Sequence, residues 1–174
     1  MTGRHIAYLL LGSNIDKERN MIAAVRLLAQ AVSITAISSV YETAPAGNEH
    51  QESFLNAAVI AESPLSPEDL KARLAAIEQQ LGRRRTDDRN APRTIDLDIV
   101  VFDHQVGVVA GHPLPDPGLL SHPHVAIPLA EVAPGYVHPV TGRTLAEIAA
   151  TLAPRGGVTI RPDVDLDRSS RMPW

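Results

Sequence analysis

An apolar segment near the middle of the chain contains two aspartates at alternate positions. Residues 95–102 read Ile-Asp-Leu-Asp-Ile-Val-Val-Phe, and this β-branched composition predicts a buried strand. Because side chains i and i+2 of a strand share a face, Asp96 and Asp98 point the same way, with Cα atoms roughly 6–7 Å apart. The opposite, apolar face is expected to consist of Ile95, Leu97, Ile99 and Val101.

Such a pair of carboxylates requires a cation, since burying ionised groups that repel each other is unfavourable. Mg²⁺ ions and arginine side chains both meet that need, and two Mg²⁺ ions about 3.5–4 Å apart leave positions open for phosphate oxygens. The segment before the strand supplies the arginines: Arg83, Arg84, Arg85, Arg89 and Arg93. The acidic pair and the basic loop together indicate a site that acts on a polyphosphate.

Two simpler interpretations stay open. The aspartates can be solvated carboxylates on an exposed edge strand. Arg83 to Arg85 follow Gly82 at the expected end of a helix, where glycine caps the helix and cations complement its dipole. Neither interpretation accounts for Arg89 and Arg93, which continue the basic run up to the acidic strand.

Composition limits the class of protein. A chain of 174 residues is long enough for one domain with a substantial core. Its net charge of −4 argues against nucleic-acid binding, so the local arginines indicate a site. The lack of cysteine excludes disulfides, thiolate zinc sites and a cysteine nucleophile. The apolar run at residues 6–11 is too short for a signal sequence or a membrane span, so we expect a cytoplasmic protein.

Periodicity and turn residues predict the secondary structure of the first two thirds of the chain. The expected elements are a strand at 6–11, a helix capped by Asn14 or Asp16, a strand at 32–41, a polar loop at 43–51, a strand at 54–61, a helix from the N-cap Ser66 to about Leu81, the acidic strand, and a short strand at 106–109. This βαββαβ order predicts an α+β fold with a ferredoxin-like core, in which helices pack on one face of an antiparallel sheet.

The remainder is predicted to be an added C-terminal segment. Residues 112–128 are rich in proline and histidine and read as irregular, with a short helix at 116–122. A final helix is expected at 144–152. We predict a single domain over residues 1–160 and a solvated, charged tail over 161–174, which contains Asp163, Asp165 and Asp167.

Five motifs occur in a specific order: Leu11-Gly12-Ser13-Asn14, Tyr41-Glu42-Thr43-Ala44-Pro45, Phe54-Leu55-Asn56-Ala57-Ala58, Pro92-Arg93-Thr94-Ile95-Asp96-Leu97-Asp98, and Pro128-Leu129-Ala130-Glu131-Val132-Ala133-Pro134. From residue 6 to about 139 the chain resembles the 6-hydroxymethyl-7,8-dihydropterin pyrophosphokinase family. The resemblance implies an ATP-dependent diphosphokinase of folate biosynthesis, which moves the β,γ-pyrophosphoryl group of ATP to the pterin hydroxymethyl group and releases AMP.

The resemblance also implies roles for individual residues. Two Mg²⁺ ions would be held by Asp96 and Asp98, which with Arg85 and Arg93 form the expected catalytic set. ATP would be bound by Glu78, Arg85, Arg93 and Ile99. The reduced pterin would be bound by Thr43, Ala44, Ala46, Phe54, Asn56 and His124.

Some positions depart from the family pattern. His124 stands where a second stacking ring is expected, and Asn90 where some members have tryptophan. Asp116 replaces a common histidine and His122 a common arginine, so positive charge near the phosphates is reduced. Two alternatives therefore remain: a related kinase for a modified pterin, and a catalytically silent module that binds nucleotide or pterin. We expect no nucleic-acid or membrane partner, and a monomer, with a dimer as the alternative.

Overall fold

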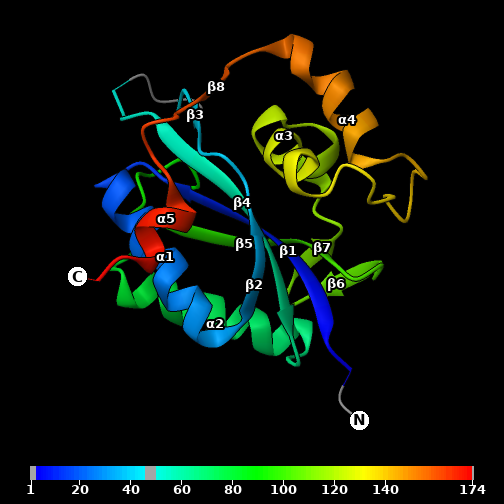
Figure 1. Cartoon of the computed structure of the whole chain (residues 1–174), viewed down its shortest axis with the longest axis horizontal. Coiled ribbons are helices and arrows are strands. Elements are labelled where there is room, and N and C mark those ends of the chain that lie inside the picture. The colour runs from blue at the N-terminus through cyan, green and yellow to red at the C-terminus, as the bar shows by residue number, and fades with distance from the viewer. Residues whose placement is uncertain (1–2, 46–49, 174) are drawn as a thin grey trace.

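The structure, a computed structural model, describes residues 3–45 and 50–173. Its elements surround one twisted sheet, with helices on both sides (Figure 1). In the described part of the chain, no helix has the length and apolar character needed to cross a membrane.

The sheet is antiparallel and is centred on β1 (His5–Ser13). This strand lies between β4 (Phe54–Ser63) and β5 (Asp96–Phe102). Successive parts of β4 pair on their other edge with β2 (Ser33–Ile37) and β3 (Tyr41–Thr43). The predicted α+β class with an antiparallel sheet is confirmed.

Helices form a layer on each face of the sheet (Figure 1). One layer contains α1 (Lys17–Ala31) and α2 (Pro67–Gln80), and the other contains α3 (Pro123–Val132) and α4 (Leu145–Leu152). The expectation of helices on one face was therefore incomplete. Proline at residue 123 occupies the first turn of α3 and Pro128 lies inside it, which explains why the segment read as irregular.

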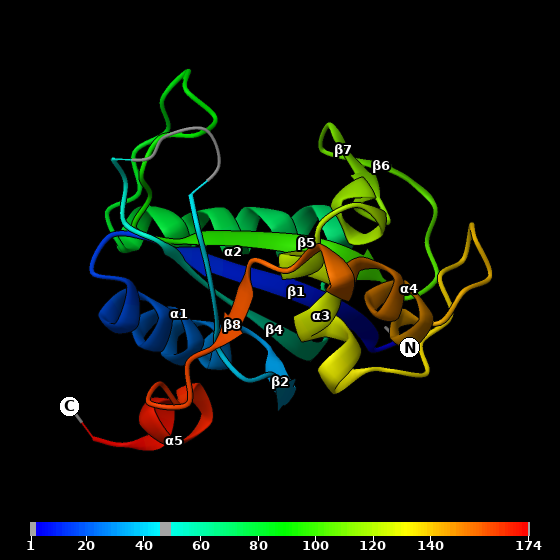
Figure 2. The same ribbon diagram turned by 90° about the horizontal axis from the view of Figure 1, so that it is seen from above.

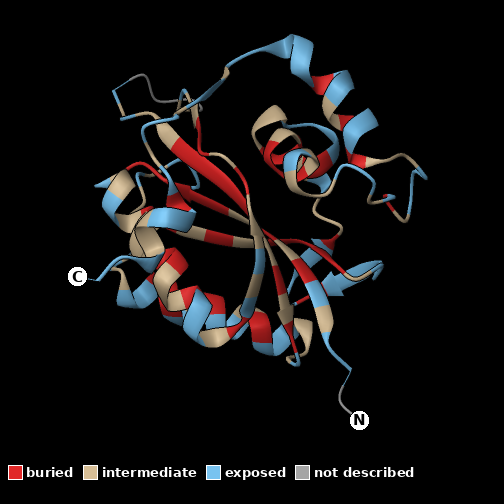
Figure 3. Ribbon diagram, viewed as in Figure 1, coloured by how far each residue is buried: buried red, intermediate tan, exposed pale blue. Residues whose placement is uncertain are grey.

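The alternation of β1 divides the core between these two layers. Leu9 and Leu11 are fully buried in the cluster with α1 and α2, whereas Tyr8 and Leu10 pack against the cluster with α3 and α4. Figure 3 shows buried residues along the central strands where the helices cover them.

The expected apolar face of β5 is confirmed for Ile95, Leu97 and Ile99, which are at most 8% exposed and belong to the first cluster. Val101 was wrongly placed on that face, because it packs in the cluster with α3 and α4. The pairing of β1 with β5 shifts register between Tyr8 and Leu9, and this irregularity interrupts the alternation.

The strand expected at 32–41 is two strands. Between β2 and β3 the chain is held to β4 by Ser38, whose hydroxyl accepts from the Ala58 amide at 2.8 Å. Ser66 caps α2 as predicted, by accepting from the Asp69 amide. Asp16 occupies the N-cap position of α1 with φ of 42°, but its side chain makes no cap hydrogen bond, so that part of the prediction was wrong.

After β5 the chain forms a hairpin of β6 (Gly107–Val109) and β7 (His112–Leu114), followed by the short 3₁₀ helix η1 (Pro117–Leu120). The short helix expected at 116–122 is therefore one 3₁₀ turn. Asp116 caps it, because its carboxylate accepts from the Gly118 amide at 2.7 Å.

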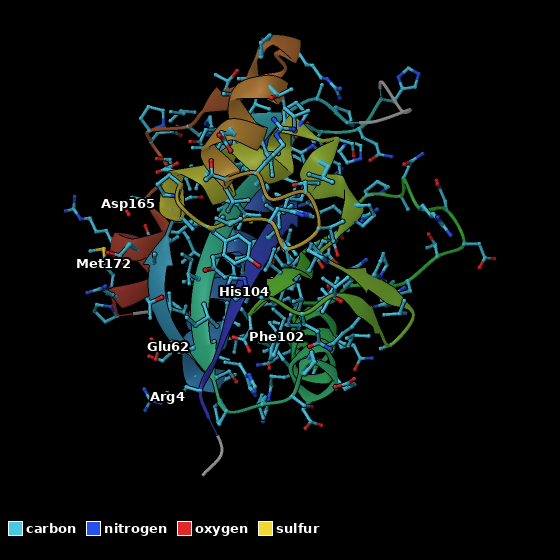
Figure 4. The ribbon with its side chains drawn as sticks, turned by 90° about the vertical axis from the view of Figure 1, so that its right-hand side faces the viewer. Arg4, Glu62, Phe102, His104, Asp165 and Met172 are labelled. Atoms are coloured by element: carbon cyan, nitrogen blue, oxygen red, sulfur yellow. The ribbon has the colours of Figure 1, made fainter. Side chains whose placement is uncertain are left out.

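The C-terminal segment is folded onto the rest of the molecule. After η2 (Ala153–Arg155), β8 (Val158–Ile160) adds to the edge of β3, and α5 (Leu166–Arg171) packs against α1. Leu166 is 2% exposed and belongs to the core. Asp165 caps α5, beside which Met172 also lies (Figure 4). Residues 161–173 therefore pack against the domain, although most of their charged side chains are exposed. The domain boundary at residue 160 stays a prediction.

Candidate active site

The acidic strand delivers its two carboxylates to one end of the sheet. In the register of the sheet, Asp96 lies opposite Gly12 and Asp98 opposite Leu10. Both carboxylates line the same two cavities. Leu97 and Ile99, which alternate with them, are buried in the core cluster with α1 and α2, although Leu97 also borders the larger cavity. The alternation predicted from the sequence places them together as expected.

Asp96 is bound by two arginines. Its Oδ1 accepts from Arg83 at 2.6 Å and its Oδ2 accepts from Arg93 at 2.7 Å. Burial alone would raise the pKa of Asp96, but these two guanidinium groups outweigh burial and hold it below its usual value. The site therefore keeps this carboxylate ionised.

Arg83 also binds a second acid, Glu78 of α2, at 2.6 Å. The Glu78 side chain is 5% exposed and also accepts from the Leu97 amide at 2.8 Å. Burial raises its pKa, although the Leu97 amide and Arg83 oppose that shift. Arg85, a member of the predicted catalytic set, is 70% exposed and lies 3.6 Å from the other Glu78 oxygen.

Asp98 is in the opposite situation. Among the described residues, no hydrogen-bond donor reaches its carboxylate within bonding distance. Burial and the nearby charge of Asp96 raise its pKa to about 7. Lys71 of α2 opposes this shift without forming an ion pair. An added cation would stabilise Asp98 in its charged form.

This pair of carboxylates fits a hard divalent cation such as Mg²⁺. Its donors are oxygens, and Asp98 lacks a compensating partner in the described part of the chain. No group of three or more acidic, histidine or cysteine side chains that could hold a metal occurs among the described residues. A cation here would take its other ligands from phosphate oxygens and water, as Mg²⁺ commonly does.

The larger cavity, of about 750 Å³, lies between α2, the arginine segment and the β6–β7 hairpin. One face of α2 contributes Lys71, Ala72, Ala75 and Glu78. The arginine segment contributes Arg83, Arg84, Arg85, Arg89 and Arg93. Six basic side chains, Lys71 among them, therefore line a cavity that has the two aspartates in its wall.

The smaller cavity, of about 520 Å³, lies on the α3 side of the sheet. Five of the six residues predicted to bind the pterin line it: Thr43, Ala44, Phe54, Asn56 and His124. The sixth, Ala46, lies outside the described residues. Arg89, Arg93, Asp96 and Asp98 line both cavities, so the two spaces meet at the acidic pair.

The walls of the smaller cavity combine polar and aromatic groups. Asn56 is 5% exposed and its amide donates to the Thr43 hydroxyl at 2.9 Å. The guanidinium of Arg93 lies 6.0 Å from the centre of the Phe54 ring. His124 stacks on His122 with ring centroids 5.3 Å apart, and burial, followed by the proximity of His122, lowers the His124 pKa.

The two polar loops beside the site contact each other through Gln51. Its side chain accepts from the Asn14 amide at 3.0 Å and donates to the Asn90 carbonyl at 2.6 Å. Figure 2 shows the segment between α2 and β5 at the same end of the sheet as the end of β3. Asn90 also lines the smaller cavity.

Two differences from the predicted residue set stand out. Ile99 is buried in the core and is not among the residues that line either cavity, so its nucleotide role stays a prediction. Arg83, one of several arginines in this loop and absent from the predicted set, makes the shortest contacts to both Glu78 and Asp96. The sequence feature that could have singled out Arg83 is its position directly after Gly82, the glycine that follows the end of α2.

A family model described as 7,8-dihydro-6-hydroxymethylpterin-pyrophosphokinase (HPPK) matches residues 8–134. The chain belongs to this family. Among its HPPK relatives, a 2-amino-4-hydroxy-6-hydroxymethyldihydropteridine pyrophosphokinase of Bacillus subtilis is 44% identical over 131 residues, which cover 74% of this chain and 78% of that protein. A protein of the same name in Methylorubrum extorquens is 39% identical over 153 residues, or 86% of this chain and 95% of the relative.

Longer proteins also contain an HPPK-like region. The Folic acid synthesis protein FOL1 of Dictyostelium discoideum is 33% identical over 156 residues, and the match spans 89% of this chain but only 23% of that protein. A solved structure of Plasmodium falciparum HPPK-DHPS with pteroate has a TM-score of 0.68 at 14% identity, covering 88% of this chain and 43% of that chain. At that identity, the likeness concerns the fold alone.

Proposed function

We propose that this chain transfers the β,γ-pyrophosphoryl group of ATP to the hydroxymethyl oxygen of 6-hydroxymethyl-7,8-dihydropterin, as a step of folate biosynthesis, and releases AMP. The observation that carries this proposal is the meeting of two cavities at Arg93, Asp96 and Asp98. The larger, arginine-lined space suits a triphosphate, and the smaller one suits a flat, polar heterocycle. Membership of the HPPK family and the names of the relatives support the same reaction.

In this reaction the pterin hydroxyl oxygen bonds to the β-phosphorus of ATP. The bond between that phosphorus and the oxygen bridging to the α-phosphorus breaks, and AMP leaves with the bridging oxygen. The hydroxyl proton passes to solvent. Phosphoryl transfer asks little covalent chemistry of a protein, so the residues act mainly by positioning and by stabilising charge.

We assign the nucleotide to the larger cavity. The guanidinium groups of Arg83, Arg85 and Arg93 would bind phosphate oxygens, a task that suits their planar geometry. Asp96 and Asp98 would hold two Mg²⁺ ions, which when bound supply charge neutralisation to the transferring group and the leaving oxygen.

We assign the pterin to the smaller cavity. Asn56 can both donate to and accept from the pterin edge, since its amide carries both kinds of group. Thr43 fixes that amide at 2.9 Å. Phe54 and His124 would stack on the heterocycle, because aromatic faces favour flat ligands.

Three broader features belong to the same proposal. We assign the βαββαβ core to the ferredoxin-like class, which is supported by β1 lying between β4 and β5 and by β2 pairing with β4. We also propose that the protein works in the cytoplasm as a monomer. No nucleic-acid partner is proposed, in keeping with the net charge of −4.

The test is product analysis with ATP, Mg²⁺ and 6-hydroxymethyl-7,8-dihydropterin, with a pterin-free reaction as control. We expect AMP and pterin diphosphate in equal amounts, only when the pterin is present. ADP in place of AMP would indicate single phosphoryl transfer. Binding of both substrates by the folded protein without products would favour the silent module.

A second candidate is a related kinase for a modified pterin. It is favoured by Asn90 and His124, which line the smaller cavity where the family pattern has larger rings. Initial rates on a series of 6-substituted dihydropterins distinguish the two. A preference for the plain hydroxymethyl compound would exclude this candidate.

A further inference from the structure

An ionic cluster lies directly behind the smaller cavity, at the base of the chain segment that joins β3 to β4. Its members are Lys17, Glu18, Glu42, Ser53, Arg161 and Asp163. They come from the start of α1, from β3, from the residue before β4 and from the segment after β8. None of them is among the residues that line either cavity.

Lys17 joins the two ends of the connecting segment. Its ammonium donates to Glu42 Oε1 at 3.0 Å, to the Ser53 carbonyl at 3.2 Å and to the Ser53 hydroxyl at 2.6 Å. An ammonium has three protons, so these acceptors satisfy it completely. The Lys17 side chain is only 12% exposed, and Ser53 also donates to Glu42.

Arg161 completes the cluster from the C-terminal segment. Its guanidinium bonds Glu42 Oε2 at 3.1 Å, Glu18 at 3.3 Å and Asp163 at 2.8 Å. Its backbone amide donates to the Val40 carbonyl at 2.8 Å. Since β8 pairs with β3 immediately before Arg161, backbone and side chain hold the same strand.

The cluster and the smaller cavity lie on opposite faces of the same two strands. Thr43 and its cross-strand partner Phe54 line the cavity. Glu42 and its partner Leu55 face the other way, where Leu55 is fully buried in the cluster with α1 and α2. Successive strand residues alternate in this manner. A change in the cluster can thus reach the cavity through the backbone of Thr43 and Phe54.

We infer that Lys17, Glu42, Ser53 and Arg161 form a clamp that positions the pterin-binding wall, and that the C-terminal segment contributes to substrate recognition by supplying Arg161. The clamp fixes the separation of Thr43 and Phe54 without touching the substrate. These are positioning residues, and the inference rests on the proposed pterin site. It gives a function to a segment that lies beyond the family match ending at residue 134.

The primary variant is Arg161→Gln, which removes the charge and the forked contact at the periphery of the clamp. Arg171→Gln is the matched control, because Arg171 also lies in the C-terminal segment and pairs with Asp167 at 2.8 Å, but it is 78% exposed and its ion pair does not involve Glu42. Arg161→Lys keeps the charge while losing the planar fork. All three should remain folded, as judged by circular dichroism.

Steady-state kinetics give the first readout. Arg161→Gln should raise the KM for the pterin about tenfold, with the KM for ATP changed less than about twofold, since only the pterin wall is displaced. The KM of Arg161→Lys for the pterin should lie between the values of wild type and Arg161→Gln, and the KM of Arg171→Gln should equal that of wild type. Equal shifts for both substrates, or the same effect in Arg171→Gln, would overturn the clamp as a positioning device.

Amide hydrogen exchange of the ligand-free protein gives a readout that does not depend on the reaction. Arg161→Gln should speed exchange at residues 42–43 and 53–56, whereas Arg171→Gln should not. Unchanged exchange there would refute the clamp even if the enzyme is active. Absence of both turnover and pterin binding in the wild type would refute the proposed function, while faster exchange would still support the clamp.

Discussion

Replacing Arg83 by methionine tests the electrostatic logic of the site most directly. Methionine keeps most of the side-chain volume and removes the charge. Arg83 lies 2.6 Å from both Glu78 and Asp96, and its side chain is 15% exposed. Its loss leaves a carboxylate that is 5% exposed and another that is 21% exposed without their shared cation.

The magnitude follows from that burial. Removing one partner of a buried ion pair typically destabilises a protein by about 3–5 kcal/mol. Arg93 still binds Asp96 at 2.7 Å, so we expect the lower end, about 3 kcal/mol at pH 7. For a domain of this size, that is a fall in Tm of about 6–12 °C.

The destabilisation caused by Arg83→Met should depend on pH. Without Arg83, burial holds the pKa of Glu78 still further above its unfolded value, so the folded state binds a proton that the unfolded state has released. The destabilisation should therefore be largest at pH 7 and shrink as the pH falls toward 5. Thermal unfolding at both pH values measures this difference.

Arg85→Met is the matched control, because Arg85 reaches the same Glu78 at 3.6 Å but is 70% exposed. Exposed ion pairs contribute little, so we expect less than about 1 kcal/mol. The reasoning would be refuted if Arg83→Met and Arg85→Met lowered the Tm equally, or if the Arg83→Met effect were the same at pH 5 and pH 7.

Three further outcomes follow from the structure. Asp98→Asn should lower turnover by about 100-fold or more. It should nevertheless raise the Tm at pH 7, because it removes a buried charge and its repulsion by Asp96, which together raise the pKa of Asp98 to about 7; a loss of Tm would contradict this. Glu42→Gln should lower the free energy of unfolding at pH 7, because the Ser53 and Lys17 contacts lower the Glu42 pKa to about 2. In urea unfolding, the difference in this free energy between wild type and variant should vanish as the pH falls from 4.5 to about 2; a difference that is constant with pH would argue against it. Asn56→Ala should weaken pterin binding by about 1–3 kcal/mol in calorimetry with little effect on a non-hydrolysable ATP analogue, and equal losses for both ligands would indicate a general collapse of the site.

Local patterns were sufficient to predict most of the sheet and the position of the acidic pair. The alternation of Asp96 and Asp98 with buried apolar residues is a property of any strand, so it needs no tertiary information. Val101 does not follow the predicted alternation, because the register of β5 shifts where this strand pairs with β1. A sequence pattern contains no record of that partner.

The choice among the arginines depended on a backbone detail. Gly82 adopts φ of 80°, a left-handed conformation that glycine tolerates. The Arg83 amide then donates to the Glu78 carbonyl at 3.0 Å, which returns Arg83 over the last turn of α2. Arg85, only two residues later, is 70% exposed and comes no closer than 3.6 Å to Glu78. Composition supplies the arginines, but the turn decides which one compensates the acids.

The C-terminal segment shows the limit of local reasoning. Its charged residues suggested solvation, and their carboxylates are indeed exposed at Asp163 and Asp167. A few tertiary contacts nevertheless hold the segment against the domain. Leu166 is buried, and Arg26 of α1 donates to the Ser169 carbonyl at 2.8 Å. A single buried leucine in a polar segment is too weak a signal to predict such packing.

The register of the central strands links the two halves of the site. Gly12 of β1 pairs with Asn56 of β4 on one side and with Asp96 of β5 on the other. Neighbouring strands are about 4.8 Å apart, so the amide assigned to the pterin and the carboxylate assigned to the phosphate region arise from backbone positions about 10 Å apart. A Cβ at Gly12 would lie 3.4 Å from Asn56 Oδ1, and both residues line the cavity assigned to the pterin. Because hydrogen bonds of the sheet fix this spacing, the distance between the two substrates' binding groups is a property of the fold before any loop contributes.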